Sequence, residues 1–186
     1  MTGPRVLGLI GWSGSGKTTL LVKLIPLLVG RGLRVSTVKH AHHTFDVDIP
    51  GKDSYEHRKA GAGEVILASS RRWVLMHEAG DGPEPALADL LRRLSPCDLI
   101  LIEGFKAEAH PRIEVFRAAA GKAVLHPGDP GIVAVASDTP LPSAGVPVAD
   151  LNDIAAVADL VLAHAAPLDA VLQRLDAQPP GAPIQR

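Results

Sequence analysis

Residues 11 to 18 read Gly-Trp-Ser-Gly-Ser-Gly-Lys-Thr and match the pattern Gly-x-x-x-x-Gly-Lys-[Ser/Thr]. An apolar segment, 6–10, precedes this octapeptide directly, and a helix-like segment, 19–25, follows it. A loop between a buried strand and a helix directs backbone N–H groups and the positive end of the helix at one anion. The sequence therefore predicts a phosphate-binding loop (P-loop) on an α/β fold.

The residue types in the loop indicate its tasks. Glycines let the backbone curl around phosphate oxygens where a Cβ atom would collide. Lys17 is expected to reach the β and γ phosphates of a nucleotide, and the Thr18 hydroxyl is expected to hold Mg²⁺. The predicted nucleotide-binding residues of the loop are Gly11, Trp12, Ser13, Gly14, Ser15, Gly16, Lys17, Thr18 and Thr19.

Short apolar runs alternate with helical patterns along the chain, which is typical of a parallel sheet with helices on both faces. We therefore predict an α/β fold of the P-loop nucleoside triphosphatase type, with a mostly parallel β-sheet flanked by helices. Strands are expected at 5–10, 33–39, 64–68, 73–76, 98–103 and 131–136, and helices at 16–30, 52–60, 85–94 and 153–164.

The length of 186 residues suits one sizeable core. We predict a single nucleotide-binding domain over 1–176 and a disordered, proline-rich tail over 177–186. Between 106 and 131 the sequence is rich in Ala, Gly and Pro around one β-like stretch, 112–117. This segment is predicted to form a small β excursion, either a subdomain or a hairpin.

Composition excludes several classes of protein. The formal net charge of −1 argues against general nucleic-acid binding. The chain has no run of eighteen apolar residues and no signal segment, and its single cysteine, Cys97, excludes an internal disulfide. We therefore expect a cytoplasmic protein with no membrane association.

The apolar run 98–102 ends in Glu103 and Gly104, as the Walker B strand of a nucleotide-binding protein does. A carboxylate at the carboxyl end of a strand beside the P-loop strand is able to bind Mg²⁺ or to polarise an attacking water. We predict Glu103 as a metal-binding residue and, with Lys17, as a catalytic residue. The alternative is a solvated carboxylate at the end of a strand.

Polar residues also follow the second predicted strand, in the segment 39–48. Open α/β sheets bind ligands outside the carboxyl ends of their strands, so this segment is expected near the ligand. One interpretation is a donor-rich rim for an anionic ligand, with Asp46 or Asp48 orienting Mg²⁺ or water. The predicted rim residues are Lys39, His40, His42 and His43. The alternatives are a polar surface loop and a metal site made of His42, His43, Asp46 and Asp48.

Two further segments carry possible ligand contacts. Asp138 follows the strand 131–136, where an aspartate is able to accept hydrogen bonds from a guanine base, although the chain has no Asn-Lys-x-Asp motif. Four residues between 51 and 62 are expected either to contact a phosphorylated ligand or to lie on the surface of a helix. They are Lys52, His57, Arg58 and Lys59.

Four segments in a fixed order form a more particular pattern than the P-loop alone. They are Trp12 to Leu20, Val38-Lys39-His40-Ala41-His42-His43, Gly51-Lys52-Asp53-Ser54-Tyr55 with Arg58 to Ala62, and Leu101-Ile102-Glu103-Gly104-Phe105-Lys106. Through them, most of residues 5 to 140 resembles molybdopterin-guanine dinucleotide biosynthesis protein B (MobB), a family of P-loop GTP-binding proteins.

The resemblance implies a homodimer that binds GTP and Mg²⁺, hydrolyses GTP weakly and assists the conversion of molybdopterin to molybdopterin guanine dinucleotide. It also implies that a partner, a MobA-type molybdopterin guanylyltransferase, carries out the nucleotidyl transfer. The rim residues would then face a pterin phosphate or a ligand bound to the partner. A P-loop small-molecule kinase and a non-catalytic nucleotide-binding adaptor are the alternatives.

Overall fold

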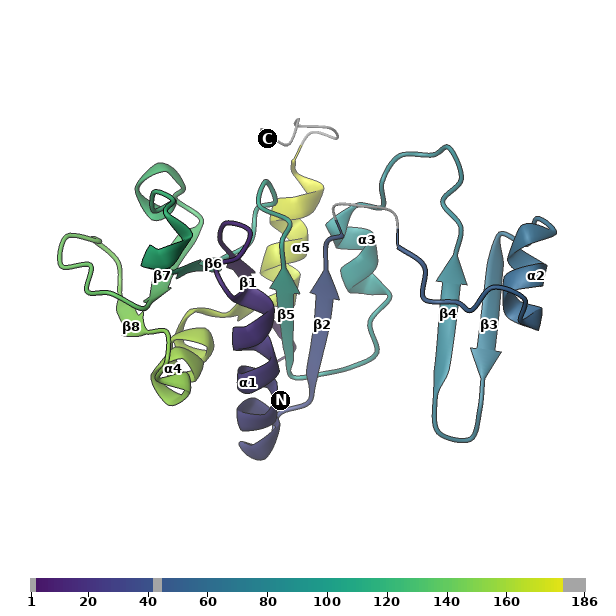
Figure 1. Cartoon of the computed structure of the whole chain (residues 1–186), viewed down its shortest axis with the longest axis horizontal. Helices are drawn as coiled ribbons and strands as arrows, with labels where there is room; N and C mark the ends of the chain where they lie inside the picture. The colour runs from purple at the N-terminus through teal and green to yellow at the C-terminus, as the bar shows by residue number, and fades with distance from the viewer. Residues whose placement is uncertain (1–2, 42–44, 179–186) are drawn as a thin grey trace. The chain divides into compact units, whose positions relative to one another are not determined.

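The computed structural model describes residues 3–41 and 45–178, and the chain divides into two compact units (Figure 1). The larger unit contains the residues up to His40 and those from Leu87 onward. The smaller unit is the segment Ala41–Ala86 between them. The P-loop belongs to the larger unit, which we describe first.

A seven-stranded sheet forms the centre of the larger unit. Its strands follow the order β2-β5-β1-β6-β7-β8 in parallel pairs, and β9 pairs with β1 in the antiparallel direction. The predicted mostly parallel sheet is confirmed. The strands are β1 Arg5–Ile10, β2 Val35–Lys39, β5 Leu99–Glu103, β6 Arg112–Phe116, β7 Ile132–Ser137, β8 Val148–Asp150 and β9 Ala166–Pro167.

Helices cover both faces of this sheet (Figure 1). Successive strand residues point to opposite faces, so Leu7 and Val6 of β1 belong to different cores. Leu7 packs in the cluster that α1 (Lys17–Gly30) and α4 (Ile154–His164) close, and Val6 packs in the cluster that α3 (Leu87–Arg92) and α5 (Leu168–Asp176) close. Helix α1 continues through Pro26. The sequence analysis did not predict α5.

The structure corrects the position of the small β excursion. Residues 112–116 were expected outside the main sheet, but β6 lies between β1 and β7 and pairs in parallel with both. Its polar residues alternate with apolar ones, as in a half-exposed hairpin, yet Arg112 and Glu114 are both buried. Asp129 accepts two hydrogen bonds from the Arg112 guanidinium, and Glu114 accepts backbone N–H groups from the loop that follows.

That loop contains two short 3-10 helices, Ala118–Ala120 and His126–Gly128. At the C-terminus of the described chain, Gln178 accepts a hydrogen bond from the backbone N–H of Ala109 at 3.1 Å. Residues 179–186 of the expected tail lie outside the described residues.

The smaller unit contains the antiparallel pair β3 (Glu64–Ala68) and β4 (Trp73–His77) and the helix α2 (Asp53–Lys59). Val65 and Met76 pair on the buried face of this two-stranded sheet. Ile66, Leu75 and Trp73 lie on the other face, where they are 67%, 37% and 65% exposed. The small antiparallel excursion of the fold is therefore the segment 64–77.

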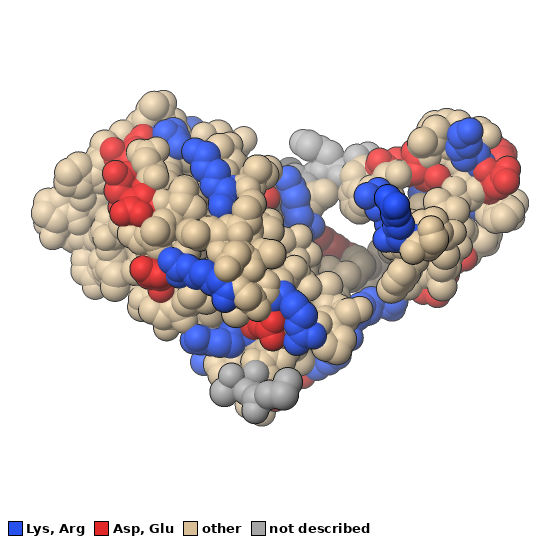
Figure 2. Space-filling model, turned by 90° about the horizontal axis from the view of Figure 1, so that it is seen from below, with Lys and Arg blue, Asp and Glu red and all other residues tan. Residues whose placement is uncertain are grey.

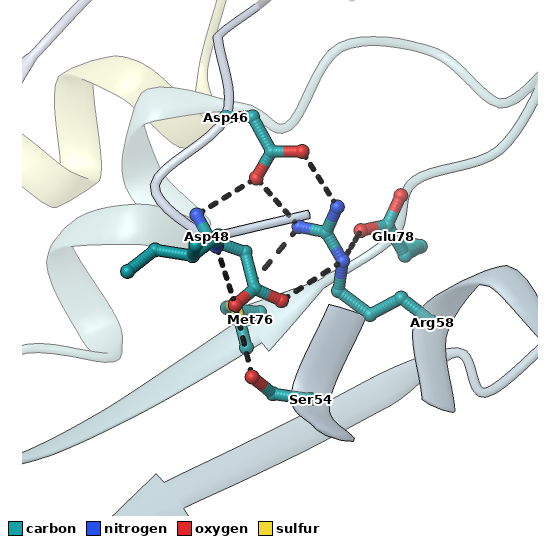
Figure 3. A network of polar contacts seen from close by, with 7 residues as sticks. Asp46, Asp48, Ser54, Arg58, Met76 and Glu78 are labelled. Carbon is teal, nitrogen blue, oxygen red and sulfur yellow. Dashed lines mark hydrogen bonds and ion pairs between the residues drawn. The ribbon is translucent and has the colours of Figure 1, made fainter. Parts of the chain in front are cut away.

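Arg58 is the centre of a polar network in the smaller unit (Figure 3). Its guanidinium donates to both carboxylate oxygens of Asp46, at 3.0 and 2.8 Å, and lies 3.7 Å from Asp48 and 3.3 Å from Glu78. Asp48 in turn accepts a hydrogen bond from Ser54 at 2.9 Å. The Arg58 side chain is only 13% exposed, so this cation is engaged inside the unit.

The charges are dispersed over the face of the molecule drawn in Figure 2, where Lys and Arg side chains lie among Asp and Glu side chains and most of the surface is uncharged. Among the described residues, no helix is long and apolar enough to cross a membrane.

Candidate nucleotide-binding site

The P-loop connects the buried strand β1 to the first turn of α1, as predicted. A Cβ atom on Gly11 would lie 2.5 Å from the carbonyl oxygen of Val115 in β6, so only glycine fits where the two strands approach. Gly16 is the N-cap residue of α1. The exposed N–H groups of the first turn and the partial positive charge of the helix therefore face the loop.

Lys17 lies across the P-loop. Its ammonium group donates to the carbonyl oxygens of Gly11 and Trp12, at 3.0 Å each. Partial burial lowers the pKa of the Lys17 ammonium, and the positive charges of Lys106 and Lys39 lower it further, while Glu103 opposes them. An anion bound in the loop would relieve this repulsion, which suits a phosphate-binding lysine.

Thr18 and Glu103 meet at the edge of the P-loop. The Thr18 hydroxyl donates to Oε1 of Glu103 at 2.8 Å, and the Lys39 ammonium lies 3.6 Å from the same oxygen. This geometry follows from the sheet, because β5 lies between β1 and β2 and places the three side chains at one end. A hydroxyl and a carboxylate are oxygen ligands of the kind that Mg²⁺ prefers.

The backbone after Glu103 packs against His40. Gly104 has a φ of +94°, and a Cβ atom there would lie 2.8 Å from Cβ of His40. The ring of the next residue, Phe105, lies 4.8 Å from the His40 ring between centroids. Lys39 and His40 of the predicted rim therefore lie beside Glu103.

The remaining predicted contacts of segment 39–48 are His42, His43 and Asp46. His42 and His43 lie outside the described residues. Asp46 belongs to the smaller unit, and both of its carboxylate oxygens contact Arg58, which holds the pKa of the Asp46 carboxyl below its ordinary value. Among the described residues, no group of three His, Cys, Asp or Glu side chains is arranged to hold a metal ion.

Trp12 attaches the P-loop to the loop after β6. The indole N–H donates to the carbonyl oxygen of Ala123 at 2.8 Å. The ammonium groups of Lys106 and Lys122 lie 5.4 and 5.8 Å from the centroid of the indole ring. Trp12 thus lies beside two further cations at the mouth of the candidate site.

Asp138 and Arg117 lie on the opposite side of the P-loop from Glu103. Asp138 follows β7 and accepts a hydrogen bond from the backbone N–H of Ala118 at 2.9 Å. Its other oxygen lies 3.6 Å from the guanidinium of Arg117, which follows β6. The sequence analysis gave Arg117 no role, because β6 was not expected inside the sheet. A cation directly after a strand of alternating pattern is the signal that could have found it.

Arg112, the other arginine of the segment 106–131, does not form part of a lid over the loop. Its side chain is 8% exposed and pairs with Asp129 at 2.9 Å. This contact gives no support to the small-molecule kinase alternative, which requires arginines that close over phosphates.

Comparison with known proteins identifies the family. The sequence model of the MobB family, molybdopterin guanine dinucleotide synthesis protein B, matches residues 6–138, from the P-loop strand to Asp138. The chain belongs to this family. The molybdopterin-guanine dinucleotide biosynthesis adapter protein of Escherichia coli (strain K12) is 50% identical over 163 residues, which are 84% of this chain and 91% of that protein. The adapter protein of Haemophilus influenzae is 43% identical over 159 residues, or 84% and 86% of the two chains.

Solved structures of MobB proteins share the fold. A crystal structure of molybdopterin-guanine biosynthesis protein B aligns with a TM-score of 0.62 at 27% identity and covers 85% of this chain and 98% of that chain. The MobB homologue from Bacillus stearothermophilus aligns with a TM-score of 0.60 at 27% identity, over 85% and 95% of the two chains. These likenesses confirm the predicted P-loop fold class.

Proposed function

We propose that this member of the MobB family binds GTP and Mg²⁺ at its P-loop and acts as an accessory protein in the synthesis of molybdopterin guanine dinucleotide. The observation that carries the nucleotide site is the contact between Thr18 and Glu103, with Lys17 in the loop beside them. The names of its relatives, which are called adapter proteins of this biosynthesis, support the pathway.

Mg²⁺ would be held by the Thr18 hydroxyl and the Glu103 carboxylate. Their oxygens lie 2.8 Å apart in a hydrogen bond, and both would turn from each other to the ion when it enters with the nucleotide. The ion would neutralise phosphate charge. Lys39, 3.6 Å from Glu103, holds that carboxylate in place from the side of β2.

Guanine is the proposed base. The Asp138 carboxylate lies at the carboxyl end of β7 and is 18% exposed as a side chain. A carboxylate only accepts hydrogen bonds, so it suits the two N–H donors on the edge of guanine and not the acceptor on the corresponding edge of adenine. Preference for GTP over ATP is therefore expected to depend on Asp138.

Hydrolysis of GTP is proposed to be slow and to depend on Lys17 and Glu103. Glu103 is 9% exposed and is already bonded to Thr18, so it serves the metal better than it serves a water molecule in line with the γ phosphate. The nucleotidyl transfer itself is assigned to a partner, a MobA-type molybdopterin guanylyltransferase. An accessory protein that uses free GTP is expected to work in the cytoplasm.

The partner's substrate would meet the predicted rim. Molybdopterin and its guanine dinucleotide are anionic, and Lys39 and His40 lie next to the P-loop with cationic or donor groups. His42 and His43 are proposed to extend this rim, and Asp46 stays a proposed ligand of Mg²⁺ or water in a nucleotide-bound state.

A homodimer is proposed on the exposed face of the smaller unit. Ile66, Leu75 and Trp73 are neighbours on one side of β3 and β4, and a two-stranded sheet is marginally stable alone in water. Covering this face with a second copy would bury the apolar side chains and stabilise the sheet.

Calorimetric titration of the full chain with GTP and ATP in Mg²⁺ tests the site. Lys17→Ala is expected to weaken GTP binding at least about 100-fold, because a charge-assisted contact to two phosphates is lost. Arg174→Ala, an exposed cation of α5, is the matched control and is expected to bind as the unchanged chain does. Equal affinity for GTP and ATP would refute the role of Asp138, and unchanged binding by Lys17→Ala would refute the site.

A further inference from the structure

Arg117 points its guanidinium at the N-terminus of α1. Its Nη2 atom lies 3.5 Å from the position that a Cβ atom on Gly16, the N-cap residue, would occupy. The same side chain lines a small hollow beside the P-loop, whose other lining residues include Gly16, Thr19, Lys23 and Asn152. Arg117 thus stands where the phosphates of a nucleotide approach the helix.

A cation at this position is electrostatically unfavourable in the absence of an anion. The N-terminus of α1 carries a partial positive charge, and Lys17 adds a full charge to the same loop. The counter-ion of Arg117 in the structure is Asp138, whose Oδ2 lies 3.6 Å from Nη1. That separation allows ionic attraction but is too long for a hydrogen bond, so the pair is loosely held.

We infer that Arg117 is a nucleotide-binding residue, which leaves Asp138 and donates to phosphate oxygens at the N-terminus of α1 when a guanine nucleotide binds. This inference rests on the proposed function and adds a residue to it. Binding would replace one loose ion pair by two sets of contacts. The guanidinium would donate to the phosphates, and the Asp138 carboxylate would accept hydrogen bonds from the N–H groups of guanine.

The exchange links base recognition to phosphate binding. A ligand with phosphates but no guanine, such as inorganic tripolyphosphate, would separate Arg117 from Asp138. Oδ1 of the carboxylate would keep its hydrogen bond from the N–H of Ala118, but Oδ2 would lose its cation. Guanosine triphosphate satisfies both groups together. The pair therefore favours ligands that carry both chemical features, although each residue contacts only one of them.

Calorimetric titrations of the full chain with GTP and with tripolyphosphate, both in Mg²⁺, test the inference. Arg117→Ala is expected to weaken the binding of both probes by about 10- to 100-fold, because both present phosphate oxygens. Arg174→Ala, an exposed arginine of α5 in the same unit, is the matched control and is expected to change neither affinity. Arg117→Lys keeps the charge without the planar fork and is expected to give an intermediate loss.

Asp138→Asn is expected to affect the binding of the two probes differently. This variant removes the counter-ion of Arg117, so tripolyphosphate is expected to bind as tightly as before or more tightly, while GTP binds more weakly. The inference is overturned if Arg117→Ala and Arg117→Lys bind tripolyphosphate as the unchanged chain does. A parallel titration of Lys17→Ala separates the two proposals: retained GTP binding there contradicts the proposed function, whereas lost binding there with normal binding by Arg117→Ala contradicts the inference alone.

Discussion

The two units of the chain are stabilised in different ways. In the larger unit, two clusters of buried apolar side chains lie on the two faces of the parallel sheet. In the smaller unit, the buried hydrophobic residues among those described are Val65 and Met76, and the conspicuous internal feature is Arg58 with three carboxylates around it. Large apolar side chains of this unit are instead exposed.

This difference indicates that the two units have different roles. Phosphate binding needs backbone N–H groups held in fixed directions, and a close-packed core supplies that rigidity around β1 and α1. A segment with so little apolar burial depends on polar contacts and on whatever covers its exposed face. We therefore expect changes in the larger unit to affect the stability of the whole fold, and changes in the smaller unit to act locally or on association.

The largest effect is expected from a cavity in the larger core. Leu24 of α1 is fully buried in the cluster on the first face of the sheet. Leu24→Ala is expected to lower the free energy of unfolding by about 2–5 kcal/mol, since transfer and cavity terms add. Val22→Ala, at a 66% exposed position of the same helix, is the control for denaturant titration. Losses of similar size for both variants would contradict the assignment of this face of α1 to the core.

The next largest effect is expected from His110, as a loss of stability at low pH. Its ring lies beside Gly8 of β1, and both ring nitrogens are buried without a hydrogen-bond partner among the described residues. Burial and, to a smaller extent, the positive charge of Arg112 lower the pKa of His110 from 6.5 to about 4, and the negative charge of Asp129 opposes them. The folded state thus favours neutral His110, and this contribution is present above pH 6.5.

As the pH falls from 6.5 towards 4, His110 becomes protonated in the unfolded chain but stays neutral in the folded chain. The free energy of unfolding therefore decreases by up to about 3 kcal/mol. Denaturant titrations at several pH values check this slope. His110→Phe should flatten it, while His77→Phe, a 48% exposed side chain of the smaller unit, should leave it in place. An unchanged slope in His110→Phe would show that other groups cause the acid sensitivity.

Removal of Arg58 is expected to loosen only the smaller unit. Arg58→Ala leaves Asp46, Asp48 and Glu78 close together without their cation, so the unit opens more often. Hydrogen exchange should become faster over residues 45–78 and stay unchanged in β1 and β5. Arg71→Ala, in the exposed turn between β3 and β4, is the control. Faster hydrogen exchange in β1 of Arg58→Ala would refute the claim that the smaller unit opens independently of the larger one.

The smallest effect on stability is expected at Trp73. This side chain is 65% exposed, so Trp73→Ser should change the unfolding free energy of the single chain by about 0.5 kcal/mol or less. Sedimentation velocity should show weakened self-association, because the proposed dimer loses its largest apolar contact. If Trp73→Ser self-associates as strongly as the unchanged chain, the proposed interface on this face is wrong.

The sequence predicted the larger unit well where local patterns carry the structure. The P-loop, β1, β5 and α1 follow from an apolar run, a glycine-rich loop and a helical pattern that adjoin each other. Glu103 beside Thr18 followed from the rule that ligands lie at the carboxyl ends of parallel strands, and the structure places the two side chains in contact.

Prediction failed where a tertiary contact decides the environment of a residue. Arg112 and Glu114 made β6 look half-exposed, because a sequence does not show that Asp129 and the loop N–H groups bury both charges. With β6 moved out of the sheet, Arg117 had no place beside the P-loop. For Arg58 the sequence left open a ligand contact or the surface of a helix. It did not show the three carboxylates that contact the guanidinium, because they lie ten or more residues away along the chain.

The central proposal is that GTP held by the P-loop lets this chain assist a partner transferase. The direct measurement is the rate of molybdopterin guanine dinucleotide formation by a purified MobA-type guanylyltransferase with molybdopterin and GTP, with and without the chain. The account predicts that the unchanged chain raises this rate and that Lys17→Ala, confirmed to be folded, does not. Equal stimulation by both chains, or no stimulation by either at saturating GTP, would contradict it.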